Sequence, residues 1–410
     1  MLHTLYGDGV HDDTAAIQEL IDSSACSLTL PAPEKFYLIS RPLELPSNFS
    51  LSLPRFAEIR LADNSNCAMI KNRLTRDEDA PEVAPDSPFH FPEYTRQFAK
   101  AEESQNIELC GGIWNCNNLG QMPNPIQTRD FSVREFWGYG MIFFKVKGLI
   151  LRDLTLKDPT NFGVTLDTVS YFTAENIVFD YNLGNPKAIN MDGLHFNGNC
   201  HFGVIRNLKG TCYDDLVALN ADEGTKGPIT NISIDGLFAE NCHSAVRLLT
   251  VRQRIENIHI SNVFGTYYQY CIGLTKYYKG QTEGYYDGIF IDHVLASKAV
   301  RERDVYPWPD SYVYSLIWID RETLVKNLKI TELSRKEYNN PVATVCVREG
   351  SRVERMILDG VYTENCTESS EMPLLFNEGE IGELVLRDVR TGEEKIENHG
   401  EGKIGQTRGG

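Results

Sequence analysis

The chain has 410 residues, and its 40 basic and 57 acidic side chains give a formal net charge of −17 at pH 7. Apolar residues make up 41% of the sequence, which is enough for a large core and excludes a disordered chain. The acidic balance argues against a nucleic-acid partner, because no basic stripe is present to displace counterions from phosphates. The longest apolar runs are too short to span a bilayer, so no membrane partner is expected.

The first residues and the cysteines bear on location. Residues 1–8 show no basic segment followed by an apolar stretch, so no signal peptide is predicted. Ten cysteines are an ordinary number for this length, and reduced thiols in a cytoplasmic protein are the simpler interpretation. A secreted protein whose signal peptide had been removed would look the same. Cys212, Cys242 and Cys271 recur at similar spacing and predict a buried column rather than a metal site.

The first predicted element is a helix over about residues 12–22. Asp12, Asp13 or Thr14 can cap its first turn, and Ile17 and Ile21 lie on one face. Such an amphipathic helix can cover the open end of a stack of strands, whose unpaired backbone otherwise invites aggregation. Residues 74–105 are charged and rich in proline, which predicts a loop excursion, and the polar residues 394–410 predict a flexible tail.

Repeated short strands dominate the rest of the chain. Segments such as 232–237 and 258–263 alternate in polarity and end in a small or polar residue followed by an aliphatic one. The penultimate residues of these segments, which we call the marker positions, are 153, 176, 207, 236, 262, 293, 332, 360 and 388. Their variable spacing favours a parallel β-helix over leucine-rich repeats, propeller blades or a β-sandwich. The predicted fold class is all-β, a single-stranded right-handed parallel β-helix forming one domain over residues 1–393 with an N-terminal capping helix.

Residues 6–17, YGDGVHDDTAAI, resemble an N-terminal motif of pectin-active β-helix proteins, which polygalacturonases and phage tailspikes share. The resemblance implies a pectin lyase-like solenoid. The motif itself is expected to be structural, because its glycines suit a tight turn and its acids suit a helix cap.

A second resemblance involves residues that carry chemistry. Asn190-Met191-Asp192 resembles the Asn-x-Asp motif of glycoside hydrolase family 28, the polygalacturonase family, and Asp214-Asp215 resembles its Asp-Asp motif. His243 stands where the family has Gly-His-Gly, and Lys276 stands where it has Arg-x-Lys. The intervals 192–214, 215–243 and 243–276 are each about one turn of the repeat. The resemblance implies inverting hydrolysis, with Asp214 as general acid and the other two aspartates activating water.

The stacking of turns supports this chemistry independently of the family. Equivalent positions on neighbouring turns lie about 4.8 Å apart, so Asp192, Asp214 and Asp215 are expected to form one carboxylate cluster. Like charges at this distance raise at least one pKa, which supplies a protonated acid beside an ionised base. Glycosidic cleavage needs both, and it needs no cofactor or metal. The alternatives are a solvated pair of turn residues or calcium ligands.

Further residues are candidates for holding the substrate. Arg247 and Lys276 could hold a sugar carboxylate or hydroxyl groups, and Tyr278 could stack on a sugar ring. Asn190 belongs to the first motif, and His195 either lines the site or belongs to the core. His243 could tune the acid through a hydrogen bond, or it could be structural. The family's arginine is Leu274 here, and Cys242 and Ser244 replace its glycines, which puts galacturonate as the substrate in doubt.

The sequence therefore predicts a polygalacturonase-like glycoside hydrolase with exo action on an α-linked pectic or related oligosaccharide or polysaccharide. One alternative is another β-helix enzyme, such as a polysaccharide lyase or a fructan-transforming lyase. Another is a non-enzymatic carbohydrate-binding or tailspike-like protein, which would have no clustered carboxylates in one groove. Assembly with further copies of the same chain, as a homo-oligomer, stays open.

Overall fold

The computed structural model describes residues 4–73, 102–123, 138–277, 282–302, 309–369, 371–392 and 396–409. These residues form two compact units. The first contains residues 1–204, 212–214 and 223–225, and the second contains residues 205–211, 215–222 and 226–410. The predicted single domain over residues 1–393 stays a prediction. The predicted excursion at 74–105 lies largely outside the described residues, although its last two residues belong to strand β7.

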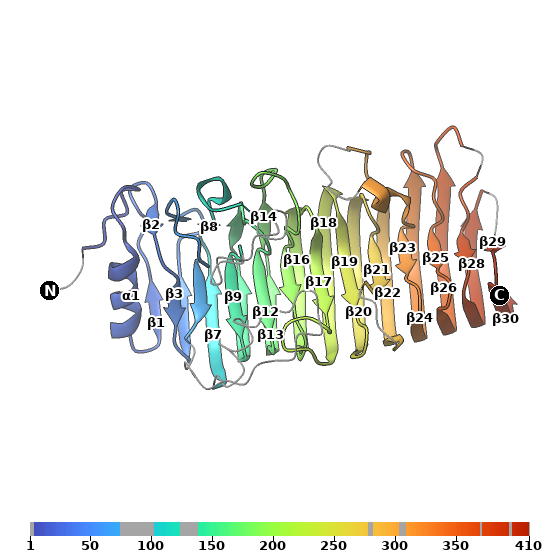
Figure 1. Ribbon diagram of the computed structural model, residues 1–410, viewed down its shortest axis with the longest axis horizontal. Coiled ribbons are helices and arrows are strands. Elements are labelled where there is room, and N and C mark those ends of the chain that lie inside the picture. The colour runs from blue at the N-terminus through green and yellow to red at the C-terminus, as the bar shows by residue number, and fades with distance from the viewer. Residues whose placement is uncertain are drawn as a thin grey trace. The chain divides into compact units, whose positions relative to one another are not determined.

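Within its described residues, the first unit has one helix and short parallel strands that pair in three columns (Figure 1). Helix α1 is Thr14–Ser23. One column is β1 (Ser27–Thr29), β4 (Phe49–Ser52), β7 (Ser104–Cys110), β10 (Val146–Arg152) and β13 (Ser170–Glu175). The next is β2 (Tyr37–Ile39), β5 (Glu58–Leu61), β8 (Ile113–Asn115), β11 (Thr155–Lys157) and β14 (Val178–Asp180). The third is β3 (Leu43–Leu45), β6 (Ile70–Asn72), β9 (Met141–Phe144), β12 (Val164–Asp167) and β15 (Leu194–Phe196).

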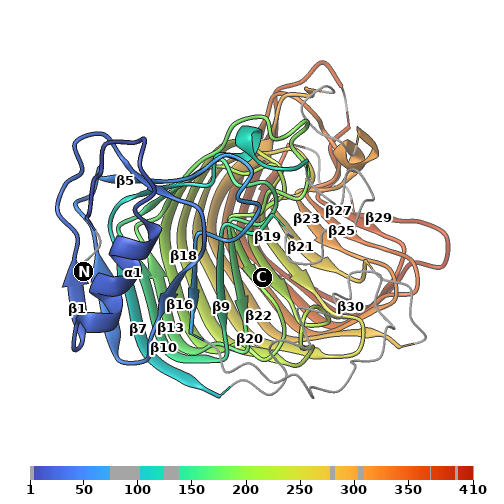
Figure 2. The same cartoon turned by 60° about the vertical axis from the view of Figure 1, so that its left-hand side comes forward.

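The second unit repeats this pattern with longer strands, and strand β16 (His201–Thr211) has residues in both units. Its long strands are β18 (Ile229–Cys242), β20 (Arg254–Tyr267), β22 (Gly284–Lys298), β24 (Thr323–Glu337), β26 (Arg352–Asn365), β28 (Glu380–Thr391) and β30 (Lys403–Gly409). Its short strands are β17 (Asp215–Asn220), β19 (Ser244–Leu249), β21 (Ile272–Thr275), β23 (Ile317–Ile319), β25 (Val345–Val347), β27 (Leu375–Asn377) and β29 (Ile396–Asn398). The described residues include two 3-10 turns, Asn118–Gly120 in the first unit and Pro309–Val313 in the second. In Figure 2, β20 and β22 run side by side.

Parallel pairing confirms the predicted all-β fold class, a parallel β-helix with an N-terminal helix. Strands β18 and β20 pair in parallel with Ile232 opposite Ile258, as the repeat requires. Both of these side chains are buried, because alternate residues of each strand face the core. The repeated aliphatic residues therefore stack from turn to turn inside the coil.

The marker positions have a shared backbone conformation that explains the repeat. All of them adopt φ between 42° and 78°, in the left-handed region. Asparagine, aspartate and glycine tolerate this region better than other residues, which accounts for the small or polar residue at the end of each repeated segment. Each marker bends the extended chain once per turn. Neighbouring markers also bond to one another, since Asn176 Nδ2 donates to Asp153 Oδ1 at 3.0 Å.

The N-terminal motif is structural, as predicted. Asp12 Oδ1 accepts a hydrogen bond from the Thr14 amide at 2.8 Å at the start of α1. The carboxylate of Asp13 is buried and accepts from the Tyr6 and Gly7 amides, which fixes the turn before the helix. Ile17 and other apolar residues on one face of α1 are buried.

The C-terminal segment differs from the predicted flexible tail. Strands β29 and β30 continue both parallel ladders of the second unit, pairing with β27 and β28. Side chains of β30 are mostly exposed, so the backbone rather than apolar burial holds it there. The polar, glycine-rich composition therefore did not indicate this strand. The strand forms because the open edge of the preceding turn offers unpaired N–H and C=O groups to any extended segment.

Two further expectations concern the cysteines and the membrane. All ten cysteines are free thiols, and Cys212, Cys242 and Cys271 are fully buried, as predicted. In the described part of the chain, no helix combines the length and apolarity needed to cross a bilayer.

Candidate active site

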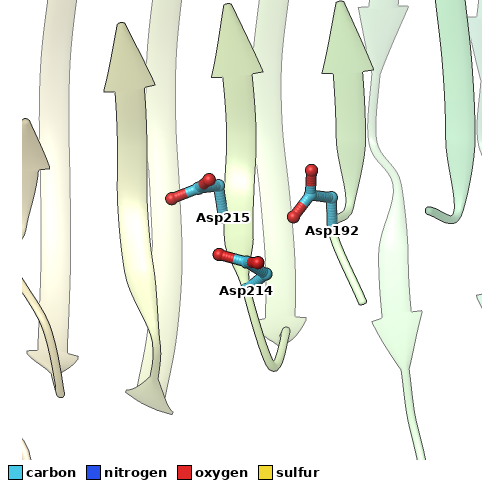
Figure 3. Close-up of side chains that lie close together, drawn as sticks. All are labelled: Asp192, Asp214 and Asp215. Atoms are coloured by element: carbon cyan, nitrogen blue, oxygen red, sulfur yellow. The ribbon is translucent and has the colours of Figure 1, made fainter. Parts of the chain in front are cut away.

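Three aspartates predicted from the sequence come together. Asp192 lies two residues before β15, Asp214 directly precedes β17, and Asp215 is the first residue of β17. One carboxylate oxygen of each lies within 4.8 Å of the other two, and Figure 3 shows the side chains next to one another. All three residues are at least 95% buried.

Asp192 is held by a histidine that bridges two carboxylates. His195 Nδ1 lies 2.6 Å from Asp192 Oδ2, and His195 Nε2 lies 2.9 Å from Glu223 Oε2. The Phe162 ring stacks on the imidazole with centroids 3.7 Å apart. Burial by itself lowers the pKa of His195, but the hydrogen bonds to the two carboxylates outweigh it and raise that pKa to about 10. His195 is therefore an imidazolium at neutral pH.

Glu223 reaches His195 because Asp167 anchors the loop that carries it. The Thr225 amide donates to Asp167 Oδ2 at 3.0 Å, and the Thr225 hydroxyl donates to Asp167 Oδ1 at 2.5 Å. Gly224, between Glu223 and Thr225 in the chain, has φ 56°, and a Cβ at this position would lie 2.1 Å from Asp167 Oδ2. Burial raises the pKa of Asp167 to about 6 despite these hydrogen bonds. The sequence analysis did not identify Asp167 or Glu223. For Glu223 a signal was present, because Glu223-Gly224 follows closely after β17.

Asp215 has its own cation. Arg247 Nε lies 3.0 Å from Asp215 Oδ2, and the Ser244 hydroxyl donates to Asp215 Oδ1. Both partners lie on β19, where Ser244 is the register partner of Asp215. Arg247 Nε also donates to the Tyr270 hydroxyl at 2.9 Å. Arg247, predicted to hold substrate, thus binds a carboxylate of the protein.

The remaining predicted residues occupy different places. His243 is buried, precedes Ser244 on the chain, and its ring lies 6.1 Å from that of Tyr268. Asn190 is half-buried with φ 51°, so it shapes the turn before Asp192. Tyr278 lies outside the described residues.

Lys276 is not brought to the carboxylates. Register through β17, β19 and β21 places it six residues further along the strand direction than Asp215, which is roughly 20 Å. Its ammonium group pairs with Glu322 Oε2 at 2.5 Å, and its amide donates to Asp320 Oδ2 at 3.0 Å. The motif spacing predicted the correct turn for Lys276, but it does not specify the position of the residue along the strand direction.

The carboxylate cluster suits acid–base chemistry, and its oxygens also lie close enough together to share a divalent cation. His195 and Arg247, however, already supply positive charge to Asp192 and Asp215. The cluster therefore does not require a metal ion to offset its charge. Two ionised carboxylates beside a third disfavour charge on that third group, so the arrangement can provide bases and an acid together.

Comparison with known proteins gives the fold and no closer relationship. No family model matches the chain, and no curated relative matches it. Among solved structures, the chain is similar to an endo-xylogalacturonan hydrolase from Aspergillus tubingensis, with 13% identity, TM-score 0.59 and 97% of each chain covered. An exopolygalacturonase from Thermotoga maritima is 12% identical with TM-score 0.57, covering 94% of this chain and 90% of that one. PfbA, a surface protein and adhesin of Streptococcus pneumoniae, is 14% identical with TM-score 0.52, covering 99% and 94%. Similarity at this level shows a shared β-helix fold.

Proposed function

We propose that the protein is a glycoside hydrolase that cleaves an α-linked pectic or related oligosaccharide by acid–base catalysis with inversion, acting from a chain end. The observation that carries this proposal is the buried cluster of Asp192, Asp214 and Asp215, in which two members have their own cation. A purely structural set of turn acids would gain nothing from being buried together, because like charges repel most strongly away from water.

The cations assign the roles. The imidazolium of His195 favours the ionised form of Asp192, and the guanidinium of Arg247 favours the ionised form of Asp215. Two ionised carboxylates can polarise a water molecule between them. Their combined negative charge favours a protonated Asp214, which is the state that a general acid needs.

The reaction then balances in one displacement. Asp214 gives its proton to the glycosidic oxygen as the bond to the anomeric carbon breaks. Water attacks that carbon from the opposite face and loses its proton to Asp192 or Asp215. The proton returns to Asp214 through solvent, and the free enzyme is restored.

The competing functions fit the site less well. A non-enzymatic carbohydrate-binding protein has no need for three buried carboxylates in contact range. A lyase that abstracts the sugar proton with an arginine or lysine fits less well, because Arg247 is held by Asp215 and Lys276 is held by Glu322. The hydrolases and the adhesin found by structural comparison all share the fold, so they support the scaffold and do not distinguish between these functions.

The decisive experiment measures reducing-sugar release from a panel of pectic and non-pectic oligosaccharides. Wild-type protein should release sugar from at least one of them without producing the unsaturated ends that a lyase leaves. Asp214→Asn should reduce that release by about 10²–10⁴-fold. No release from any member of the panel, or equal release by the variant, would overturn the proposal.

A further inference from the structure

A row of residues leads away from Arg247 along the outer face of the second unit's short strands. Register places five positions opposite one another on β19, β21, β23, β25 and β27, namely Arg247, Gly273, Trp318, Cys346 and Phe376. Their neighbours within each strand, such as Leu248 and Ile317, are fully buried in the core. Alternation in a strand therefore directs this row to the opposite, outer face. Four strand spacings make the row about 19 Å long.

Aromatic rings fill this row. Gly273 has no side chain, and a Cβ there would lie 2.6 Å from the Tyr270 ring, so the glycine makes room for the tyrosine. Tyr314 meets Tyr270 edge-on with centroids 6.0 Å apart and meets Trp318 at 4.3 Å. Phe376 packs against the same cluster, and it and Tyr314 are only partly buried. We call Tyr270, Tyr314, Trp318 and Phe376 the aromatic row.

A polar row runs beside the aromatic row, two residues further along the strands. Asp320 accepts from the Lys276 amide, and Arg348 Nε lies 2.8 Å from Glu378 Oε2. The Arg348 guanidinium also lies over the Trp318 ring, 5.2 Å from its centroid. Aromatic rings beside a few fixed polar groups are the usual composition of a carbohydrate site, because a sugar ring has apolar C–H faces and a polar edge.

The indole N–H of Trp318 points to a missing acceptor. Trp318 is 94% buried, and its Nε1 has no hydrogen-bond partner within the described ranges. Buried indole N–H groups normally find one. Trp114, the other tryptophan in the described ranges, donates to the Gly111 carbonyl oxygen at 3.1 Å. A ligand oxygen would satisfy Trp318 in the same way.

The charged side chains around the aromatic row indicate which kind of sugar fits. Arg247 is paired with Asp215, and Arg348 is paired with Glu378. A uronate carboxylate placed here would have to compete with these carboxylates and would also face Asp320. A neutral sugar would meet no such repulsion and could bond to the same groups through its hydroxyls.

We propose that the aromatic row is a substrate subsite for a neutral sugar residue, with the Trp318 indole N–H donating to a sugar oxygen. This inference deepens the proposed hydrolase function and rests on it for the identity of the ligand as a saccharide. It also assigns Gly273 a specificity role, since any side chain there would displace Tyr270.

The test measures binding, so that it is independent of turnover. Calorimetric titration of the Asp214→Asn protein would use three neutral probes, β-1,4-galactotriose, xylotriose and maltotriose, and one acidic probe, trigalacturonate. At least one neutral probe should bind more tightly than trigalacturonate. Adding Trp318→Phe, which keeps an aromatic ring and removes the N–H, should weaken that binding about threefold to tenfold. Trp114→Phe is the matched control and should leave the affinity unchanged.

The outcomes separate this inference from the function itself. Tighter binding of trigalacturonate than of every neutral probe, or equal affinities for the Trp318→Phe and Trp114→Phe proteins, would overturn the neutral subsite. Thermal unfolding without ligand shows whether each variant is folded. Trp114→Phe loses the hydrogen bond to the Gly111 carbonyl oxygen, so its unfolding midpoint should be the lower of the two. Neutral-probe binding that depends on Trp318, together with no sugar release by wild-type protein, would refute the hydrolase and leave the binding site standing.

Discussion

His195 Nδ1 lies 2.6 Å from Asp192 Oδ2, and both side chains are almost fully removed from water. Glu223 Oε2 lies 2.9 Å from the other ring nitrogen, so a carboxylate faces each nitrogen of the ring. Burial lowers the pKa of His195, but the two carboxylates outweigh that effect and raise the pKa to about 10. A histidine that the sequence left between lining residue and core residue is thus the cation that fixes the charge of a candidate catalytic carboxylate. It also connects the cluster to the loop anchored by Asp167.

Stability should depend on pH through His195. Its pKa is about 10 in the folded protein against an ordinary value of 6.5, so the folded state binds the proton more tightly than the unfolded state. The resulting stabilisation is fully present below pH 6.5 and is lost as pH rises through about 10. Thermal unfolding of His195→Gln should lack this decline between the two values. Parallel curves for the two proteins would contradict the ion pairs.

The acid role of Asp214 predicts a dependence on the leaving group. A nitrophenyl glycoside of a sugar that the enzyme accepts needs little protonation on departure. Asp214→Asn should therefore recover part of its lost rate on this substrate. Asp192→Asn and Asp215→Asn should not recover, because their defect lies in water activation. Steady-state rates on natural and activated substrates make the comparison, and equal recovery in all three variants would remove the distinction between acid and base.

Removing the cation beside Asp215 should destabilise the protein strongly. Arg247→Gln leaves a fully buried carboxylate without its ion pair, which should cost about 3 kcal/mol or more in the free energy of unfolding. Arg321→Gln is a suitable control, because the pair of Arg321 with Glu349 is more than half exposed on both sides. That variant should lose no more than about 1 kcal/mol. Similar denaturation midpoints for both variants would mean that the buried pair contributes no more to the free energy of unfolding than the exposed pair.

Activity should survive chelation. His195 and Arg247 offset the charge of the cluster, and acid–base hydrolysis requires only the correct protonation states. Sugar release with and without EDTA measures this directly. Loss of turnover that calcium restores would favour a lyase or a metal-assisted mechanism.

The anomer of the first product tests the role of water. Carboxyl pairs of inverting glycosidases are usually about 6.5–9.5 Å apart and those of retaining ones about 5–5.5 Å, whereas oxygens here lie within 4.8 Å. With three carboxylates, one pair can hold the water while the third donates the proton, so we expect inversion. Proton NMR of the fresh product shows the configuration. Retention would indicate a covalent intermediate on Asp192 or Asp215.

Local chemistry explains what the sequence determined. The marker residues revealed the coil because a left-handed backbone position admits few residue types, and that restriction leaves a visible repeat. The three aspartates could be grouped because parallel turns bring equivalent positions together. Helix α1 was visible through its apolar face and its acidic start.

Tertiary structure decided the partners. Glu223 reaches His195 only because Asp167 captures Thr225, a contact across 58 residues that no local pattern encodes. The structure places Arg247 at the carboxylate cluster and Lys276 away from it. The position of a residue along its strand depends on register, which motif spacing does not specify. The last strands likewise formed where composition predicted a tail, since the edge of the preceding turn supplied hydrogen bonds that the segment could not make alone.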